Sequence, residues 1–407
     1  MAQTAPTPRL ALTFIIITLT IDAMGIGLIL PVLPALIRDI TGADLGQAAI
    51  WGGIMTTIFA AMQFLFGPVV GSLSDRYGRR PILLGSLAIV AVDFVIMGMA
   101  HAMWLLLLTR IIGGIATSTQ STAAAFIADI SPPEQKAANF GLIGAAFGIG
   151  FVLGPIIGGL LGELGPRMPF FAAAGLAALN LVFGYFVLPE TVDDRIRRPF
   201  ELSRANPFGA LKSVGKLEGV QRLLIIAFIY EFAFIVYPTV WAYFTQERFG
   251  WSEGMVGLSL GCFGISMAFV QGVLIRVIMP RFGERATIVY GCIFNVVIFC
   301  VLGFMTNGWV VLALTPVTAL GAVVTPAIQG LMSRKAADNQ QGELQGVLTS
   351  AKALALILSP LVMTQLFFVF TREGGTYVPG APFLLASALV FCALIVFLTR
   401  RRSNAAA

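Results

Sequence analysis

The sequence predicts an all-α membrane protein with twelve transmembrane helices in two six-helix bundles around a central cavity. Of its 407 residues, 57% are hydrophobic and only 11% are charged, whereas about a quarter of the residues in soluble domains are charged. Apolar stretches of about 20 residues, long enough to cross a ~30 Å hydrocarbon core, recur along the whole chain. A long polar break near the middle separates six of these stretches from six others.

Hydropathy windows bounded by charged or Pro/Gly-rich breaks place the individual spans. The first apolar run continues from Arg9 to Pro34 and has no small-residue cleavage site, so we expect it to be retained as a helix and not removed as a signal peptide. The predicted spans are 9–33, 48–73, 81–100, 104–128, 138–162, 168–188, 222–245, 253–279, 285–304, 309–333, 344–369 and 379–399.

Basic residues concentrate in alternate connections, which predicts the orientation because cytoplasmic loops retain Lys and Arg. This basic set comprises Arg76, Arg79, Arg80, Lys136, Arg281, Arg285, Arg334, Lys335 and Arg400 to Arg402. We therefore expect a multi-pass protein of the bacterial inner membrane with both termini in the cytoplasm. The net charge of +6 is explained by this placement, so we expect membrane lipids and no nucleic acid as partners.

The predicted domains are an N-terminal bundle, 1–188, a cytoplasmic linker, 189–221, and a C-terminal bundle, 222–407. The linker is rich in arginine, which indicates contact with an anionic leaflet, and a solvated connector with no function beyond tethering is the favoured interpretation. A weak repeat supports two related bundles. The segment Tyr77-Gly78-Arg79-Arg80 after the second span is echoed by Phe282-Gly283-Glu284-Arg285 after the eighth.

Several function classes lack the residues they require. The single histidine, His101, lies in a short connection, and the cysteines have irregular spacing within apolar segments (Cys262, Cys292, Cys300 and Cys392). Neither a metal site nor a disulfide framework is indicated. We find no catalytic cluster or phosphate-binding loop, so we expect neither an enzyme nor a bound cofactor.

The connection between the second and third spans carries the most specific pattern. It reads Gly71-Ser-Leu-Ser-Asp75-Arg76-Tyr-Gly78-Arg79-Arg80-Pro81 and resembles the signature loop of the major facilitator superfamily. The resemblance implies the major facilitator fold and a gating latch, in which Asp75 and Arg79 or Arg80 interact with Asp129 and the start of the eleventh span. Positive-inside anchoring alone would explain the arginines, but not Asp75 or the glycines.

The fifth predicted span contains small residues four apart, Gly150, Gly154 and Gly158, together with Pro155 and Gly159. Such spacing allows helices to pack closely, and an interior proline bends a helix. The stretch also resembles the superfamily's antiporter motif, which implies export. Packing alone is the alternative explanation.

Three charged residues lie at similar membrane depth, where charge is costly and marks functional candidates. Asp22 and Asp93 lie about 18–20 Å from the cytoplasmic side, and Arg110 lies about 10 Å from the periplasmic start of its span. A buried cation between two carboxylates is suited to a proton switch, because desolvation raises the pKa of a carboxyl group and a nearby arginine lowers it. A fixed ion pair that only stabilises the bundle is the alternative.

The chain resembles the tetracycline/proton antiporters in the sequences around these charges, such as Asp22-Ala-Met-Gly25-Ile-Gly27 and Arg110-Ile-Ile-Gly-Gly, and along most of its length. It departs from them at two positions. Asn295 stands where those exporters usually carry an aspartate, and Ser266 stands where they usually carry a histidine. Glu231 is an acid that the resemblance does not predict, and we expect it to serve as a second proton or cation site; packing or a lipid-edge position is the alternative.

Amides and aromatic side chains at membrane depth are candidates for substrate binding. They are Gln63, Gln120, Gln271 and Asn295, with Phe59, Phe147, Phe234, Tyr237 and Trp241. Many such aromatic residues instead face lipid or the core.

These expectations combine into one function, the proton-coupled efflux of a small amphipathic, drug-like compound by a monomer. Protons are the coupling ion in this interpretation. The alternative transporter function is a proton-coupled carrier of one metabolite. A receptor or scaffold is disfavoured, because charges buried at a common depth in a repeated bundle indicate a permeation path.

Overall fold

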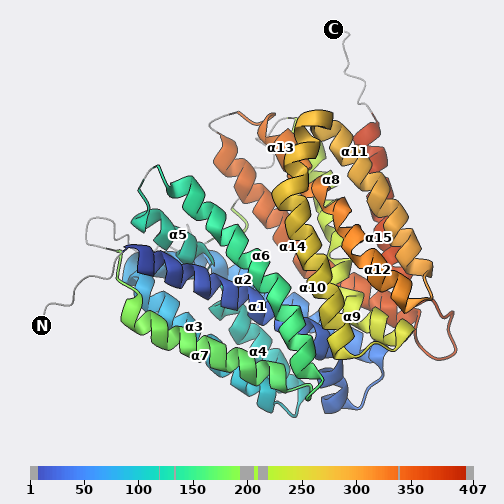
Figure 1. Ribbon diagram of the computed structural model, residues 1–407, viewed down its shortest axis with the longest axis horizontal. Coiled ribbons are helices and arrows are strands. Elements are labelled where there is room, and N and C mark those ends of the chain that lie inside the picture. The colour runs from blue at the N-terminus through green and yellow to red at the C-terminus, as the bar shows by residue number, and fades with distance from the viewer. Residues whose placement is uncertain are drawn as a thin grey trace, which may run out of the picture.

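The computed structural model describes residues 8–118, 120–132, 134–192, 206–209, 219–337 and 340–399, and within these ranges it contains helices and no strand (Figure 1). Most of the predicted linker, 189–221, lies outside the described residues. The N-terminal bundle contains α1 (Pro8–Thr41), α2 (Leu45–Tyr77), α3 (Arg79–Met99), α4 (Met103–Ala116), α5 (Gln120–Ile130), α6 (Lys136–Gly162) and α7 (Met168–Val187).

The C-terminal bundle begins after the linker. Its elements are α8 (Gln221–Phe234), α9 (Val236–Phe249), α10 (Glu253–Phe269), the π-helix η2 (Val270–Leu274), α11 (Ile275–Phe304), α12 (Gly308–Thr318), the 3-10 helix η3 (Ala319–Val323), α13 (Val324–Ser333), α14 (Gln341–Val369) and α15 (Ala381–Leu398).

The described residues contain 11 helical stretches that are long and apolar enough to cross a membrane. One of them, Glu253–Phe304, is 52 residues long and is divided by Gly283, which has a left-handed φ of 73°. Division at this glycine gives the twelve spans that the sequence predicts. The chain is therefore a multi-pass membrane protein.

The predicted repeat is visible in the backbone. Gly78 separates α2 from α3 with a φ of 109°, and Gly283 occupies the corresponding position in the C-terminal bundle with a φ of 73°. Left-handed backbone strongly favours glycine. Both bundles therefore turn between their second and third spans on a residue without a Cβ.

Several predicted single spans are broken into two helices. The seventh span breaks after Phe234, because Pro238 has no N–H to donate to the carbonyl of Phe234 and instead lies in the first turn of α9. The tenth span contains Pro316 in α12 and tightens into η3 before α13 begins. These breaks lie within the spans, where the sequence predicts continuous helices.

The two bundles splay apart toward the end at which α1 begins and α15 ends, here called the terminal end, and meet at the opposite end (Figure 1). Hydrogen bonds join them from mid-depth to that opposite end. Thr57 Oγ1 donates to the carbonyl of Ile357 at 2.8 Å, and the Gly254 amide donates to the carboxylate of Glu163 at 2.9 Å. The molecule is therefore closed at the end away from its termini.

Candidate functional site

An ion pair lies inside the N-terminal bundle between α3 and α4. Arg110 Nη2 is 3.5 Å from Asp93 Oδ2, and the two side chains are 10% and 5% exposed. The guanidinium also lies over the ring of Phe59 on α2, 5.4 Å from the ring centroid, and contacts Met97 Sδ. Burying two charges is costly, and breaking such a pair leaves one charge without a partner. Here α3 and α4 supply the two charges, and α2 supplies the ring that covers the guanidinium.

Two glycines of α4 create the space for this pair. A Cβ on Gly113 would lie 2.9 Å from Asp93 Oδ2, and a Cβ on Gly114 would lie 2.7 Å from the carbonyl of Phe59. Real Cβ atoms essentially never approach other atoms so closely. The sequence Arg110-Ile-Ile-Gly-Gly therefore places the cation and removes the side chains that would displace its partner.

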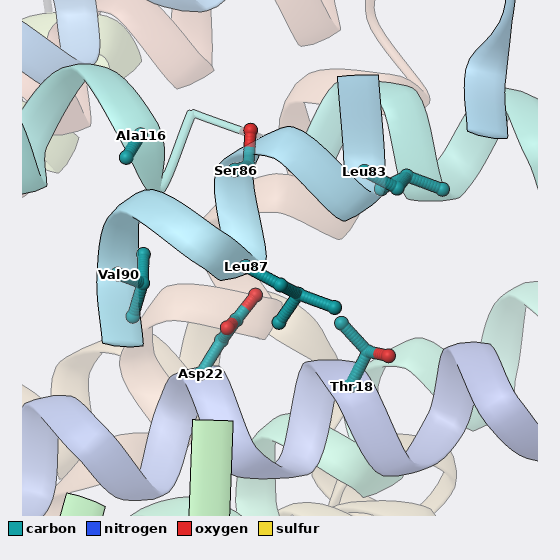
Figure 2. Close-up of a pocket in the computed structure, with 7 residues that line it drawn as sticks. All are labelled: Thr18, Asp22, Leu83, Ser86, Leu87, Val90 and Ala116. Carbon is teal, nitrogen blue, oxygen red and sulfur yellow. The ribbon is translucent and has the colours of Figure 1, made fainter. Parts of the chain in front are cut away.

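Asp22 borders a separate small cavity between α1, α3 and α4. The cavity has a volume of about 10 Å³, close to the minimum that one water needs. In Figure 2 the Asp22 carboxylate points toward Leu87 of α3, and the hydroxyl-bearing Thr18 and Ser86 also line the space. The remaining lining residues are apolar: Leu83, Leu87, Val90 and Ala116.

The cavity and the ion pair adjoin each other along two helix faces. On α3, Val90 lines the cavity and Asp93 follows one turn later. On α4, Arg110, Gly113 and Ala116 are spaced by three residues, which places them along one face. The structure therefore brings the three predicted charges to the region where α1, α3 and α4 meet. The ion pair described there joins Arg110 to Asp93.

Three of the predicted latch residues of the N-terminal bundle, Asp75, Arg79 and Asp129, meet at the terminal end. Arg79 Nη1 lies 2.6 Å from Asp75 Oδ1, and Arg79 Nε lies 2.9 Å from Asp129 Oδ2. Arg80 donates to the carbonyl of Tyr185, whereas Arg76 is exposed and lies over the ring of Tyr77. Arg79 therefore joins α2, α3 and α5, and Gly71 lies on α2 one turn before Asp75.

Sequence reasoning missed Glu190, which follows α7. Its carboxylate accepts hydrogen bonds from the backbone amides of Arg79 and Arg80, at 2.9 and 3.2 Å. A Cβ on Gly78 would lie 2.3 Å from Glu190 Oε2. An acid directly after the sixth span, at the same membrane side as the arginine-rich loop, is the signal that could have identified it.

The glycine stripe of α6 packs against the backbone of α1. Cβ atoms on Gly150, Gly154 and Gly158 would lie 2.3, 2.6 and 2.4 Å from the carbonyl oxygens of Thr20, Met24 and Leu28, respectively. The next face of α6 contacts the other bundle, because a Cβ on Gly159 would lie 2.5 Å from the carbonyl of Glu253 in α10, and Pro155 lies against Gly257. The predicted motif thus packs within one bundle and between the two.

Glu163, directly after α6, was not predicted and joins the bundles. It accepts a hydrogen bond from the amide of Gly254 and interacts with the side chain of Ser252. These hydrogen bonds favour the ionised carboxylate and lower the pKa of Glu163 below its ordinary value.

In the C-terminal bundle, Glu231 and Asn295 have different surroundings. Glu231 is half-buried, and its carboxylate accepts a hydrogen bond from Thr325 at 2.9 Å. Asn295 is 0% exposed, and its amide nitrogen lies 3.2 Å from the Tyr230 hydroxyl and 2.9 Å from the carbonyl of Gly291. The amide thus ties α8 to α11 within a packed core.

The predicted substrate residues divide into enclosed and accessible groups. Tyr237 and Trp241 are 4% and 2% exposed and belong to an aromatic core with Phe299 and Phe383, in which Trp241 donates to Ser259. The more accessible members are Phe59, Gln63, Phe147, Phe234 and Gln271. The side chain of Gln120 lies outside the described part of the structure.

Within the described ranges, no group of three or more His, Cys, Asp or Glu side chains is arranged to hold a metal ion. The buried charged side chains of the described residues are Asp93, Arg79 and Arg110. Such groups exchange protons and rearrange ion pairs.

Comparison of the sequence with known protein families and proteins agrees with this architecture. The sequence profile of the Major Facilitator Superfamily matches residues 15–360 and 223–406. The chain is 40% identical over 377 residues to the class C tetracycline resistance protein of Escherichia coli, covering 92% of this chain and 94% of that protein. It is 27% identical to the quinolone resistance protein NorA of Staphylococcus aureus (strain COL), covering 94% of each.

Solved structures give the same result. The crystal structure of the human organic anion transporter TETRAN aligns with a TM-score of 0.68 and 26% sequence identity, covering 96% of this chain and 100% of that one. The chain belongs to the Major Facilitator Superfamily.

Proposed function

We propose that this protein exports a small amphipathic compound in exchange for protons, by alternating access between its two bundles. The observation that carries the proposal is the Asp93–Arg110 pair, buried between spanning helices beside the Asp22 cavity. Charges at membrane depth are costly and persist where they serve transport. A carboxylate that gains a proton loses its attraction for Arg110, so protonation would change the packing of α3 against α4.

The splayed terminal end would face the cytoplasm. Basic residues are concentrated there, and the bundles are joined at mid-depth through Thr57 and at the other end through Glu163. In the bacterial inner membrane this arrangement would be open inward and closed toward the periplasm. Substrate would then enter from the cytoplasm, and protons would enter after the periplasmic end opens.

The relatives named for tetracycline and quinolone resistance support a drug-like substrate. The histidine and aspartate that tetracycline exporters usually carry are Ser266 and Asn295 here, and Asn295 is fully enclosed. We therefore favour a substrate range wider than metal-chelated tetracycline, bound near the accessible amides and aromatic residues.

Glu231 is proposed as a second proton or cation site, in the C-terminal bundle. Its contact with Thr325 joins α8 to α13, and the half-buried carboxylate retains a route to a ligand. Glu231→Gln preserves the shape of the side chain and one acceptor oxygen for the Thr325 hydroxyl, and it removes the charge. Glu373→Gln, at an exposed loop position, is the matched control. Unchanged transport and pH dependence in Glu231→Gln would overturn this part of the proposal.

The direct test is proton movement in liposomes that contain purified protein and a pH-sensitive dye. Tetracycline, norfloxacin, ethidium and an anionic drug are added in turn to unaltered protein and to Asp22→Asn. We expect a substrate-dependent proton flux that is lost in the variant. Inserted protein that moves no protons with any compound would favour a carrier of one metabolite or uncoupled transport.

A further inference from the structure

We propose that Tyr243 of α9 is a gating residue at the end where the two bundles meet. Its ring fills a slot that Gly52 of α2 leaves open, and its buried hydroxyl, which has no partner there, favours separation of the bundles. The inference rests on the alternating access of the proposed function, and it names a side chain that sets how readily this end opens.

The slot exists because α2 carries a glycine where α9 approaches it. A Cβ on Gly52 would overlap the hydroxyl of Tyr243 and would lie 2.9 Å from Cζ of the same ring. Gly52 belongs to the N-terminal bundle and Tyr243 to the C-terminal bundle. Any side chain at position 52 would therefore displace the ring, or the helix that carries it, away from the other bundle.

The slot belongs to a close-packed seam between the bundles. The next residue, Gly53, faces α14, where a Cβ would overlap the hydroxyl of Thr364 and lie 3.0 Å from its methyl carbon. About two turns nearer the start of α2, a Cβ on Gly46 would lie 2.9 Å from Thr371 Oγ1, also on the side of the C-terminal bundle. Gly46, Gly52 and Gly53 thus let α2 approach α9 and α14, and we call their contacts the α2 seam.

The ring of Tyr243 is enclosed within this seam. Tyr243 is 3% exposed, and its ring centroid lies 6.4 Å from that of Phe367 in α14. Three residues later on α9, Gln246 Nε2 donates to the carbonyl of Pro31 in α1 at 3.4 Å. Residues spaced by three share a helix face, so one face of α9 makes both contacts with the N-terminal bundle.

The hydroxyl of Tyr243 opposes this packing. Its oxygen is buried and has no hydrogen-bond partner among the described residues. By contrast, the buried hydroxyls of Thr364 and Tyr230 donate to the carbonyls of Pro360 and Gly321, both at 2.8 Å. A buried hydroxyl without a partner has lost its hydrogen bonds to water and gained none in return, which is costly.

Two opposing effects therefore meet in one side chain. The ring removes apolar surface from water and favours closure, whereas the hydroxyl makes the closed arrangement less stable. When the bundles separate at this end, water reaches the hydroxyl and the cost disappears. A substrate or a proton then needs a smaller difference in affinity between the two states to open this end, because the states lie closer in free energy.

The test measures the distance between spin labels at the exposed positions His101 and Glu373. These positions follow α3 and α14, so they lie at the closed end of the N-terminal and C-terminal bundles, respectively. Each protein is reconstituted in lipid nanodiscs. The ratio of short to long distances is determined at neutral and mildly acidic pH, with and without tetracycline or norfloxacin.

Two substitutions separate the hydroxyl from the slot, and each has a matched control. Tyr243→Phe removes the hydroxyl alone, and Tyr290→Phe does the same at a position that is 44% exposed. Gly52→Ala fills the slot, whereas Gly67→Ala adds a Cβ to the same helix where nothing lies within 4 Å.

We expect Tyr243→Phe to raise the ratio of closed to open protein about fivefold or more, because the buried hydroxyl no longer has to be left unpaired. Gly52→Ala should lower the ratio. Adding Tyr243→Leu to Gly52→Ala should restore closure, since leucine lacks the ring atoms that the new Cβ would meet. Both controls should leave the ratio unchanged.

The inference is wrong if the unaltered protein shows both distances and Tyr243→Phe leaves their ratio unchanged or lowers it. The hydroxyl would then be neutral or would help to hold the end closed. A Gly52→Ala variant that closes as well as the unaltered protein would also contradict it. One distance in every protein under every condition would instead overturn the alternating access itself.

Discussion

Arg110 Nη2 lies 3.5 Å from Asp93 Oδ2, between helices that cross the membrane, and the two side chains are 10% and 5% exposed. Each charge therefore depends on the other, because little solvent is available to replace a lost partner. Protonation of Asp93 would therefore leave Arg110 without its counterion. Substituting one residue or both distinguishes the cost of an unpaired charge from the loss of the pair.

Removal of the cation alone should destabilise the protein more than neutralising both charges. Arg110→Leu leaves the Asp93 carboxylate without its counterion, at a cost of about 3–5 kcal/mol. The double variant Arg110→Leu/Asp93→Asn should recover most of the lost thermal midpoint, measured in detergent. Transport should be absent from both variants. Equal thermal midpoints for the single and double variants would argue against a mutually dependent pair.

The latch should depend on Arg79 and not on its exposed neighbour Arg76. Arg79→Ala removes the contacts to Asp75 and Asp129, whereas Arg76→Ala loses an exposed contact with the Tyr77 ring. We expect at least a tenfold loss of transport rate in Arg79→Ala and less than a twofold loss in Arg76→Ala, measured with proteins matched for insertion. Similar losses in the two variants would indicate that the loop supplies only positive charge.

Substitution of the α6 glycines should divide by the face they occupy. A Cβ on Gly154 would lie 2.6 Å from the carbonyl of Met24, whereas a Cβ on Gly148 meets nothing within 4 Å. Gly154→Ala should therefore lower stability by about 1–3 kcal/mol through overpacking. Gly148→Ala, the matched control on the same helix, should be neutral or stabilising by up to ~1 kcal/mol. Thermal unfolding of the two variants is the measurement.

The contact between Glu163 and Gly254 should weaken at low pH. Hydrogen bonds from Ser252 and Gly254 lower the pKa of Glu163 below its ordinary value of 4.5. The contact therefore stabilises the joined arrangement above pH ~4.5, and this stabilisation is lost as the pH falls through the lowered pKa. Spin-label distances between the ends of α6 and α10 should lengthen only in acid.

Two substitutions test the assignment of this pH effect to Glu163. Glu163→Gln should lengthen the same distances at neutral pH and remove their response to acid. Glu253→Gln, at the acid beside Gly162, should retain the response. If the response disappears in Glu253→Gln and persists in Glu163→Gln, the pH effect belongs to Glu253 and the assignment to Glu163 is wrong.

Restoring the acid that tetracycline/proton antiporters usually carry in the ninth span should not restore their chemistry. In Asn295→Asp, a carboxylate oxygen would replace the amide nitrogen, which lies 2.9 Å from the carbonyl oxygen of Gly291 and 3.1 Å from that of Gly321. Oxygen would then face oxygen, at a cost of about 1–3 kcal/mol. We expect a lower thermal midpoint and no gain in tetracycline-driven proton flux. An equally stable variant with a higher flux would contradict this.

Much of the architecture is determined locally and can therefore be predicted from sequence. Runs of about 20 apolar residues must become spanning helices, because backbone groups in lipid must be paired within the segment. Likewise, the glycine stripe at residues 150, 154 and 158 predicts close helix packing from its spacing alone. The breaks near Phe234 and Pro316 were missed, because a proline permits either a kink or a new helix and the packing around it decides between them.

The amino-acid sequence by itself determined the membrane class, the number of spans, the repeat marked by Gly78 and Gly283, and the presence of Asp93 and Arg110 at membrane depth. Only the tertiary structure decided that Arg110 pairs with Asp93 while Asp22 borders a cavity with Thr18 and Ser86. It also decided that Glu190 and Glu163 join segments far apart in the chain, and that Trp241 and Asn295 are enclosed. The physical reason is that helical periodicity is a property of neighbouring residues, whereas the partner of a buried polar group depends on how several helices pack together.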